Sequence, residues 1–195
     1  MLSEQILAYF VFSVVTSVTP GPNNLMLTAT GANFGIRGGL PQLFGICLGF
    51  GLMLFLVTAG IGTALIENEK VMLALKIVGI AVLLWLSWKI ATAGRARHDE
   101  RTRPLGFFGA IAIQWVNPKG WLIAAGSMSF LQPGVAPLLQ AAFFGLTFVI
   151  LGLPCMLLWL GFGAAMQTML RTDRALRTFN LAMGALLAAT IPFLL

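Results

Sequence analysis

The sequence predicts an all-α polytopic membrane protein with six transmembrane helices, arranged as a 3+3 inverted repeat in which helices 1 and 4 are broken. First, hydrophobic residues make up 58% of the 195 residues and charged residues only 9%, unlike a soluble domain. Second, six apolar stretches are each long enough to cross a bilayer, which takes about 20 residues. Third, proline and asparagine interrupt the first such stretch of each half.

The predicted spans account for nearly the whole chain, which we expect to form one transmembrane domain over residues 1–195. They lie at roughly 4–27, 40–64, 71–90, 105–127, 137–163 and 178–195. What remains is too short for a soluble core, so any function must reside in the helical bundle. Five spans, with the broken first or fourth segment re-entrant, is the alternative. The first segment contains Glu4 and lacks a basic start, so we expect a retained helix and not a signal peptide.

The first span is interrupted by a run that contains Pro20, Gly21, Pro22, Asn23 and Asn24. Hydrocarbon tolerates broken backbone only where it faces protein or a water-filled cavity, so the run indicates a binding site. Its prolines cannot donate to carbonyls one turn earlier, and these freed carbonyls suit a substrate ammonium. The two asparagine amides either cap the broken helix ends or bind a zwitterion.

Glycines at four-residue spacing form two groups, three ahead of the second span and two inside it. They are Gly31, Gly35, Gly39, Gly45 and Gly49. In membranes this spacing favours close helix packing, and direct substrate contact is the less favoured interpretation.

The third span contains Lys76, about six residues from its start. Lys76 either snorkels to the interface or takes part in ion coupling. A charged linker at 93–104 follows and separates two half-repeats at about 1–92 and 105–195. Three spans in each half would give the halves opposite orientations, as an inverted repeat requires.

The fourth span is interrupted at Gln114, Asn117, Pro118 and Lys119. An ammonium at the bilayer centre costs at least ~2.5 kcal/mol, so Lys119 should face a polar interior. It would then anchor a substrate carboxylate, or titrate as the substrate comes and goes. The alternative is a lysine that snorkels and ties a helix end to the interface. Pro154 in the fifth span has no polar neighbours and indicates a simple kink.

Residues that catalysis or metal binding would need are missing from the span centres. The acidic residues are all peripheral: Glu4, Glu67, Glu69, Asp99, Glu100 and Asp173. This argues against a divalent-metal exporter and is unusual for a proton-coupled transporter. The single histidine, His98, lies in the linker, and Cys47 and Cys155 are isolated. We therefore expect no enzyme, no metal and no cofactor.

The basic residues predict the topology. Nine fall in the loops after the odd-numbered spans: Arg37, Lys89, Arg95, Arg97, Arg101, Arg103, Arg171, Arg174 and Arg177. Only Lys70 lies in a loop on the opposite side. Since basic loops stay cytoplasmic, both termini should face outward. The net charge of +6 is thus a topology signal and does not indicate nucleic-acid binding.

These residues resemble a known family, the lysine exporter (LysE/RhtB) family of bacterial amino-acid exporters. The matching motifs are Thr19-Pro20-Gly21-Pro22-Asn23-Asn24-Leu25 with the glycines and Arg37 that follow, Leu75-Lys76 with Gly79, Leu83 and Trp88-Lys89, and Gln114-Trp115-Val116-Asn117-Pro118-Lys119. They cover the chain nearly end to end, and the first and last together are quite specific.

Two departures from the family pattern bear on the substrate. Phe50 stands where many members carry an acidic residue, and Val82 stands where a tyrosine is common. The stretches around Leu48 and Trp88 are more similar to the cysteine and O-acetylserine exporters of the family. The resemblance therefore implies export of a small neutral amino acid, with threonine- or homoserine-type substrates next.

The sequence hypothesis is a secondary exporter in the bacterial cytoplasmic membrane that works by alternating access between two inverted halves. Its expected partners are the amino-acid substrate, membrane lipid and a second copy of the chain, and the resemblance implies protons as the coupling ion, in antiport. A membrane-embedded enzyme or lipid-handling protein is the alternative. It would need a nucleophile, metal ligands or an acid–base pair at depth.

Overall fold

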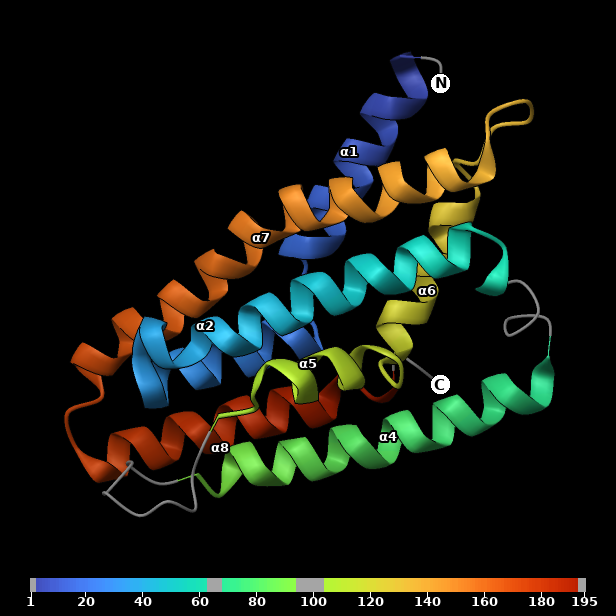
Figure 1. Cartoon of the computed structure of the whole chain (residues 1–195). Helices are drawn as coiled ribbons and strands as arrows, with labels where there is room; N and C mark the ends of the chain where they lie inside the picture. Colours follow the sequence, from blue (N-terminus) through green and yellow to red (C-terminus); the bar gives the residue numbers. More distant parts are fainter. Residues whose placement is uncertain (1–2, 63–67, 94–103, 193–195) are drawn as a thin grey trace.

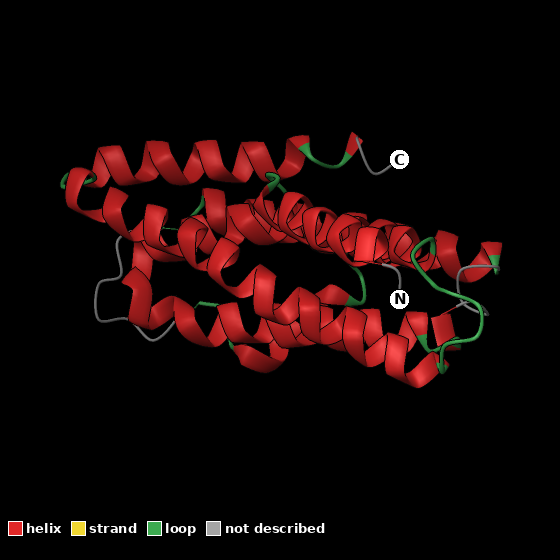
Figure 2. Ribbon diagram, turned by 90° about the horizontal axis from the view of Figure 1, so that it is seen from above, coloured by secondary structure: helices red, strands yellow, loops and turns green. Residues whose placement is uncertain are grey.

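The computed structural model describes residues 3–62, 68–93 and 104–192, and the regular structure within these ranges is entirely helical (Figures 1 and 2). The helices are α1 (Ser3–Val18), α2 (Pro22–Thr58), α4 (Glu69–Ala91), α5 (Phe107–Gln114), α6 (Pro118–Met128), α7 (Pro137–Met169) and α8 (Asp173–Ala189). The prediction of an all-α chain is confirmed. By length and composition, α2, α4 and α7 are clearly able to cross a membrane.

Helix α2 contains a sharp bend at Gly35, whose φ of 70° lies in the region that favours glycine. Across the bend, Thr30 Oγ1 donates a hydrogen bond to Gln42 Oε1 at 2.6 Å, so the two segments fold back against each other. The prediction of a loop between residues 27 and 40 was therefore wrong. The backbone is helical on both sides of Gly35. No loop is needed, because this one glycine with positive φ reverses the chain.

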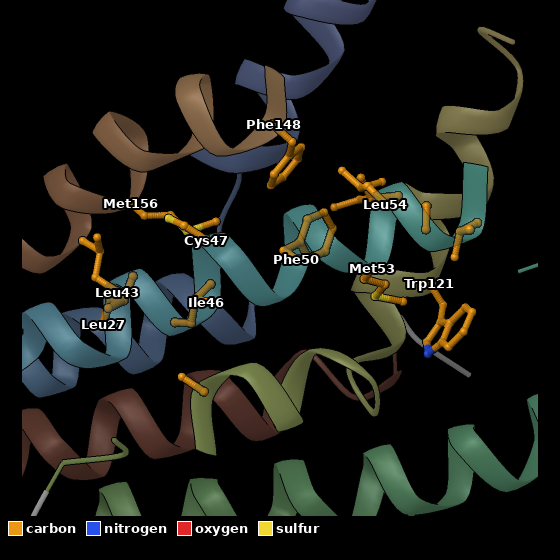
Figure 3. Packing of buried hydrophobic residues seen from close by; sticks show 14 of the residues in the cluster. Leu27, Leu43, Ile46, Cys47, Phe50, Met53, Leu54, Trp121, Phe148 and Met156 are labelled. Atoms are coloured by element: carbon orange, nitrogen blue, oxygen red, sulfur yellow. The ribbon is translucent and has the colours of Figure 1, made fainter. Parts of the chain in front are cut away.

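The core lies mainly between the second segment of α2 and α7 (Figure 3). The rings of Phe50 and Phe148 pack with centroids 4.3 Å apart. A Cβ at Gly51 would lie 3.1 Å from the Gly145 carbonyl oxygen, and one at Gly145 would lie 2.7 Å from the Gly51 carbonyl oxygen. Small residues at this crossing let the two backbones approach closely.

Both interruptions of the helices lie where the sequence predicts them. Helix α1 ends at Val18 and α2 begins at Pro22, while α5 ends at Gln114 and α6 begins at Pro118. Each new helix starts with proline, whose missing N–H is no loss in the first turn.

One end of the bundle, here called the linker end, gathers most of the described basic residues. There Asn180 Nδ2 of α8 donates to the carbonyl oxygen of Ala93, just after α4, at 2.9 Å. The Gly35 bend lies beside Gln167 near the end of α7, since a Cβ added at Gly35 would lie 3.5 Å from Gln167 Oε1. The basic residues at or beside these helix ends are Arg37, Lys89, Arg171, Arg174 and Arg177.

The remaining linker and chain ends fall outside the described residues. Arg95, Arg97, Arg101 and Arg103 lie there, as do His98 and most of the predicted linker at 93–104. Residues 64 and 193–195, where two predicted spans end, lie there as well. Lys70 begins α4 at the end opposite to the linker end.

Candidate functional site

The two helix breaks meet in space, and Lys119 joins them. Its Nζ atom, carried by the first turn of α6, donates hydrogen bonds to the carbonyl oxygens of Thr19 at 3.0 Å and Pro20 at 3.3 Å. Gly21 leaves room for this side chain, because a Cβ there would lie 2.8 Å from Nζ. Break residues about 100 positions apart in sequence therefore form one site.

The last carbonyls of α1 are free of helical partners, and side chains from elsewhere satisfy them. Asn24 Nδ2 donates to the oxygens of Ser17 at 2.8 Å and Thr19 at 3.0 Å. Trp159 Nε1 of α7 donates to the Val18 oxygen at 3.3 Å. Lys119 donates to the carbonyl oxygens of Thr19 and Pro20. The first break therefore presents a row of carbonyl oxygens to cationic or amide donors.

The amide of Gln114 links the breaks a second time. Asn23 Nδ2 donates to Gln114 Oε1 at 2.8 Å, and Gln114 Nε2 donates to the Ala110 oxygen at 2.9 Å. Asn117 instead caps α6, since its Oδ1 accepts from the backbone N–H of Lys119 at 3.2 Å. The sequence left two roles open for the amide side chains, capping a helix end or binding a zwitterion, and Asn117 has the capping role.

A cavity of about 320 Å³ opens between the breaks, here called the central cavity. Most of the predicted binding residues line it: Gly21, Pro22, Asn23, Asn24, Asn117 and Lys119. Pro20, Gln114 and Pro118 do not. Pro20 contributes its carbonyl to Lys119, Gln114 holds Asn23, and Pro118 packs against Gly79 of α4.

The sequence reasoning missed the rest of the lining. The missed residues are Thr16, Ser17, Phe50, Gly120, Ile123, Phe148 and Met156. Four of these, Phe50, Ile123, Phe148 and Met156, belong to the apolar core, and Figure 3 labels Phe50, Phe148 and Met156. Thr16 and Ser17 directly precede the first break and could have been found from that position. Phe148 and Met156 come from α7, where no motif marks them.

Ser17 is the one missed residue with unused hydrogen-bonding capacity. Its side chain is buried, and its Oγ has no hydrogen-bond partner within the described part of the chain. Since it lines the central cavity, it is placed to bind a polar group there.

The charges around the central cavity are unequal. Among the described residues that line it, Lys119 is the only cation and no carboxylate is present. Lys76 is not part of this lining. It lies half-buried on α4, one turn before Gly79, which packs against Val116 and Pro118 of the second break. The cavity can therefore offer a cation, amides and carbonyls to a ligand that carries both an anionic and a cationic group.

The predicted packing glycines lie at close approaches. A Cβ would overlap the Leu160 carbonyl at Gly31, the Leu160 side chain at Gly39 and the Phe107 carbonyl at Gly45. At Gly49 it would lie 2.8 Å from the Cα of Ile111. Gly35 differs, because its role is the bend in α2.

Comparison with known proteins gives one family and several relatives. Residues 14–191 match the family model described as LysE type translocator. A cysteine/O-acetylserine efflux protein of Salmonella choleraesuis (strain SC-B67) is 37% identical over 113 residues, 57% of each chain. A protein of the same name from Escherichia coli O1:K1 / APEC is 36% identical over 124 residues, 63% of each chain. No solved structure matches.

Proposed function

The chain belongs to the LysE type translocator family, and from this premise we propose that it exports a small neutral amino acid from the cytoplasm. The observation that carries this proposal is the meeting of the two breaks around a cavity that has Lys119 but no described carboxylate. Interrupted helices near the middle of a membrane protein are where transporters bind their substrates.

In the proposed mechanism, the substrate ammonium takes the place of the Lys119 ammonium on the carbonyls of Thr19 and Pro20. Both are cations that donate hydrogen bonds, so the carbonyls can serve one or the other. Lys119, released from the carbonyls, then pairs with the substrate carboxylate. The same lysine would thus hold the two breaks together and respond to the substrate.

The proposed substrate class follows from the charges around the central cavity. A dibasic amino acid would bring a second ammonium into a site whose described lining has no carboxylate to pair with it. We propose cysteine or O-acetylserine, which the names of the matched relatives state, and next threonine or homoserine.

The alignments to those relatives span less than two thirds of their length, so the substrate is part of the proposal.

We further propose six spans in one domain, with 3+3 inverted halves that alternate access and a proton gradient that drives antiport. Lys119, and secondarily Lys76, are the coupling candidates. The linker end would face the cytoplasm and both termini the outside, as the basic residues predict. A membrane enzyme or lipid-handling protein is not favoured.

The decisive experiment measures which amino acids leave preloaded vesicles that contain the purified protein. We expect faster efflux of O-acetylserine and cysteine than from protein-free vesicles, a further increase with an imposed proton gradient, and no effect on lysine. Efflux of lysine alone, or of no amino acid, would refute the proposed substrate class. A tag after Leu195 should be accessible from outside in intact cells.

A further inference from the structure

A line of polar side chains runs along one face of the first segment of α2, from the central cavity towards the linker end. Asn23, Thr30 and Asn33 are seven and three residues apart, a spacing that places them on the same side of an α-helix. At 1.5 Å per residue, Asn23 and Asn33 are roughly 15 Å apart along the axis, about half the hydrocarbon thickness.

Each of the three is hydrogen-bonded to a buried amide of a different segment. Asn23 pairs with Gln114 of α5, and Thr30 Oγ1 donates to Gln42 beyond the Gly35 bend. Asn33 and Asn180 of α8 exchange two hydrogen bonds, at 2.8 and 3.0 Å. Asn180 and Gln114 are fully buried and Gln42 is 1% exposed. We call these three pairs the polar seam.

The polar seam has residues in the lining of two cavities. Asn23 lines the central cavity, and Thr30, Asn33 and Gln42 line a second cavity of about 600 Å³ between α2 and the end of α4. The second cavity also has Lys89 in its lining, an exposed residue of the last turn of α4, so it reaches the surface at the linker end. Met26, 3% exposed, lies in the lining between Asn23 and Thr30.

Stable packing alone does not require this arrangement. The helix crossings around Gly31 and Gly39 are mainly close apolar and backbone contacts that hold α2 against α7, and Thr28 Oγ1 adds one hydrogen bond to the Trp159 carbonyl oxygen at 3.3 Å. Buried amides in a membrane protein are expensive unless paired, and here the pairs follow one another along a single face that touches both cavities. Uncharged amides and hydroxyls can donate to a carboxylate and accept from an ammonium.

We propose that the polar seam is the entry route of the zwitterionic substrate, with the second cavity as its vestibule at the linker end. The three pairs exchange their mutual hydrogen bonds for bonds to the passing substrate, and the flexible side chain of Met26 separates the two cavities. This proposal rests on the proposed export function for the identity of the substrate, whereas the route itself is a property of the fold.

Thiol accessibility tests the route. In a background with Cys47→Ala and Cys155→Ala, Thr30→Cys is exposed to a charged, membrane-impermeant methanethiosulfonate reagent from each side of sealed vesicles. The matched control is Phe162→Cys. Phe162 is half-exposed on α7 and lies next to Gly163, which packs against the Thr28 backbone, so it has similar depth but a different face. Ala29→Cys lines the same vestibule and serves as a second probe that breaks no hydrogen bond.

We expect Thr30→Cys and Ala29→Cys to react at least tenfold faster than Phe162→Cys, only from the linker side, and more slowly when O-acetylserine is present. Rates equal to that of the control would overturn the route. Fast labelling without protection by O-acetylserine would overturn its use by the substrate. The efflux assay on the same vesicles reports separately on the export function, so the two failures can be distinguished.

Discussion

The two helix breaks have similar sequences but make opposite contributions to the site. The first, between α1 and α2, presents carbonyl oxygens of Ser17, Val18, Thr19 and Pro20 that side chains must satisfy. The second, between α5 and α6, caps itself through Asn117 and supplies the cation Lys119. The first break supplies mainly carbonyl acceptors and the second supplies the cation, so in the proposed mechanism a zwitterion needs both.

Under the proposed inverted-repeat arrangement, this difference makes the site asymmetric, because each half contributes a different kind of group. Prolines at both breaks begin new helices, but the first break is followed by asparagines and the second by a lysine. In the proposed mechanism, the first break binds the substrate ammonium and the second break binds its carboxylate. If the halves move relative to each other, the substrate contacts change at both of its ends.

The largest expected effect comes from removing the donor. Lys119→Met should lower export by at least a hundredfold, because it removes both the hydrogen bonds between the breaks and the partner of the substrate carboxylate. Efflux from vesicles measures this, with gel filtration to show that the variant is folded. Lys76→Met separates the two coupling candidates. An equal loss there would show that the lysine in the central cavity has no special role.

The sequence predicted part of this difference between the two breaks. Prolines and asparagines showed where the chain breaks, because their backbone chemistry is local. The glycine spacing indicated close packing but could not distinguish Gly35, whose positive φ makes the bend, from Gly31 or Gly39. Phe148 and Met156 were missed because a cavity wall from a distant apolar helix leaves no local pattern.

The next largest effect tests the space between the breaks. In Gly21→Ala a Cβ would lie 2.8 Å from Lys119 Nζ and 2.9 Å from its Cδ, so the lysine must leave the carbonyls. The extended backbone of Gly21, φ −178°, accommodates alanine, so the change acts on Lys119 and not on the chain. We expect about tenfold slower export. Gly106→Ala, where a Cβ would meet no atom of the described residues within 4 Å, is the matched control. Unchanged efflux in Gly21→Ala would argue against contact between Lys119 and the carbonyls.

A smaller effect should come from the hydroxyl beside the first break. Ser17→Ala removes one neutral hydrogen bond to the substrate, worth about 1 kcal/mol, which corresponds to roughly a fivefold rise in KM at unchanged maximal rate. Ser13→Ala is the control, because Ser13 also has a buried hydroxyl on α1 but is not in the lining of the central cavity. Equal effects of the two substitutions would mean that Ser17 acts through helix packing.

The smallest expected effect measures the direct link between the breaks. Asn23→Ala and Gln114→Ala each remove one partner of the 2.8 Å amide pair, and a double-mutant cycle on thermal unfolding in detergent gives their coupling. Hydrogen bonds within membrane proteins average about 0.6 kcal/mol, and we expect a coupling of that size.

Asn24→Ala with Gln114→Ala is the control, since Asn24 bonds to Ser17 and Thr19 within the first break. Coupling only in the first cycle would establish that Asn23 faces the second break while its neighbour Asn24 holds the first together. Equal coupling in both would mean that the two breaks behave as one structural unit, and the division into acceptors and donor would have to rest on Lys119 alone.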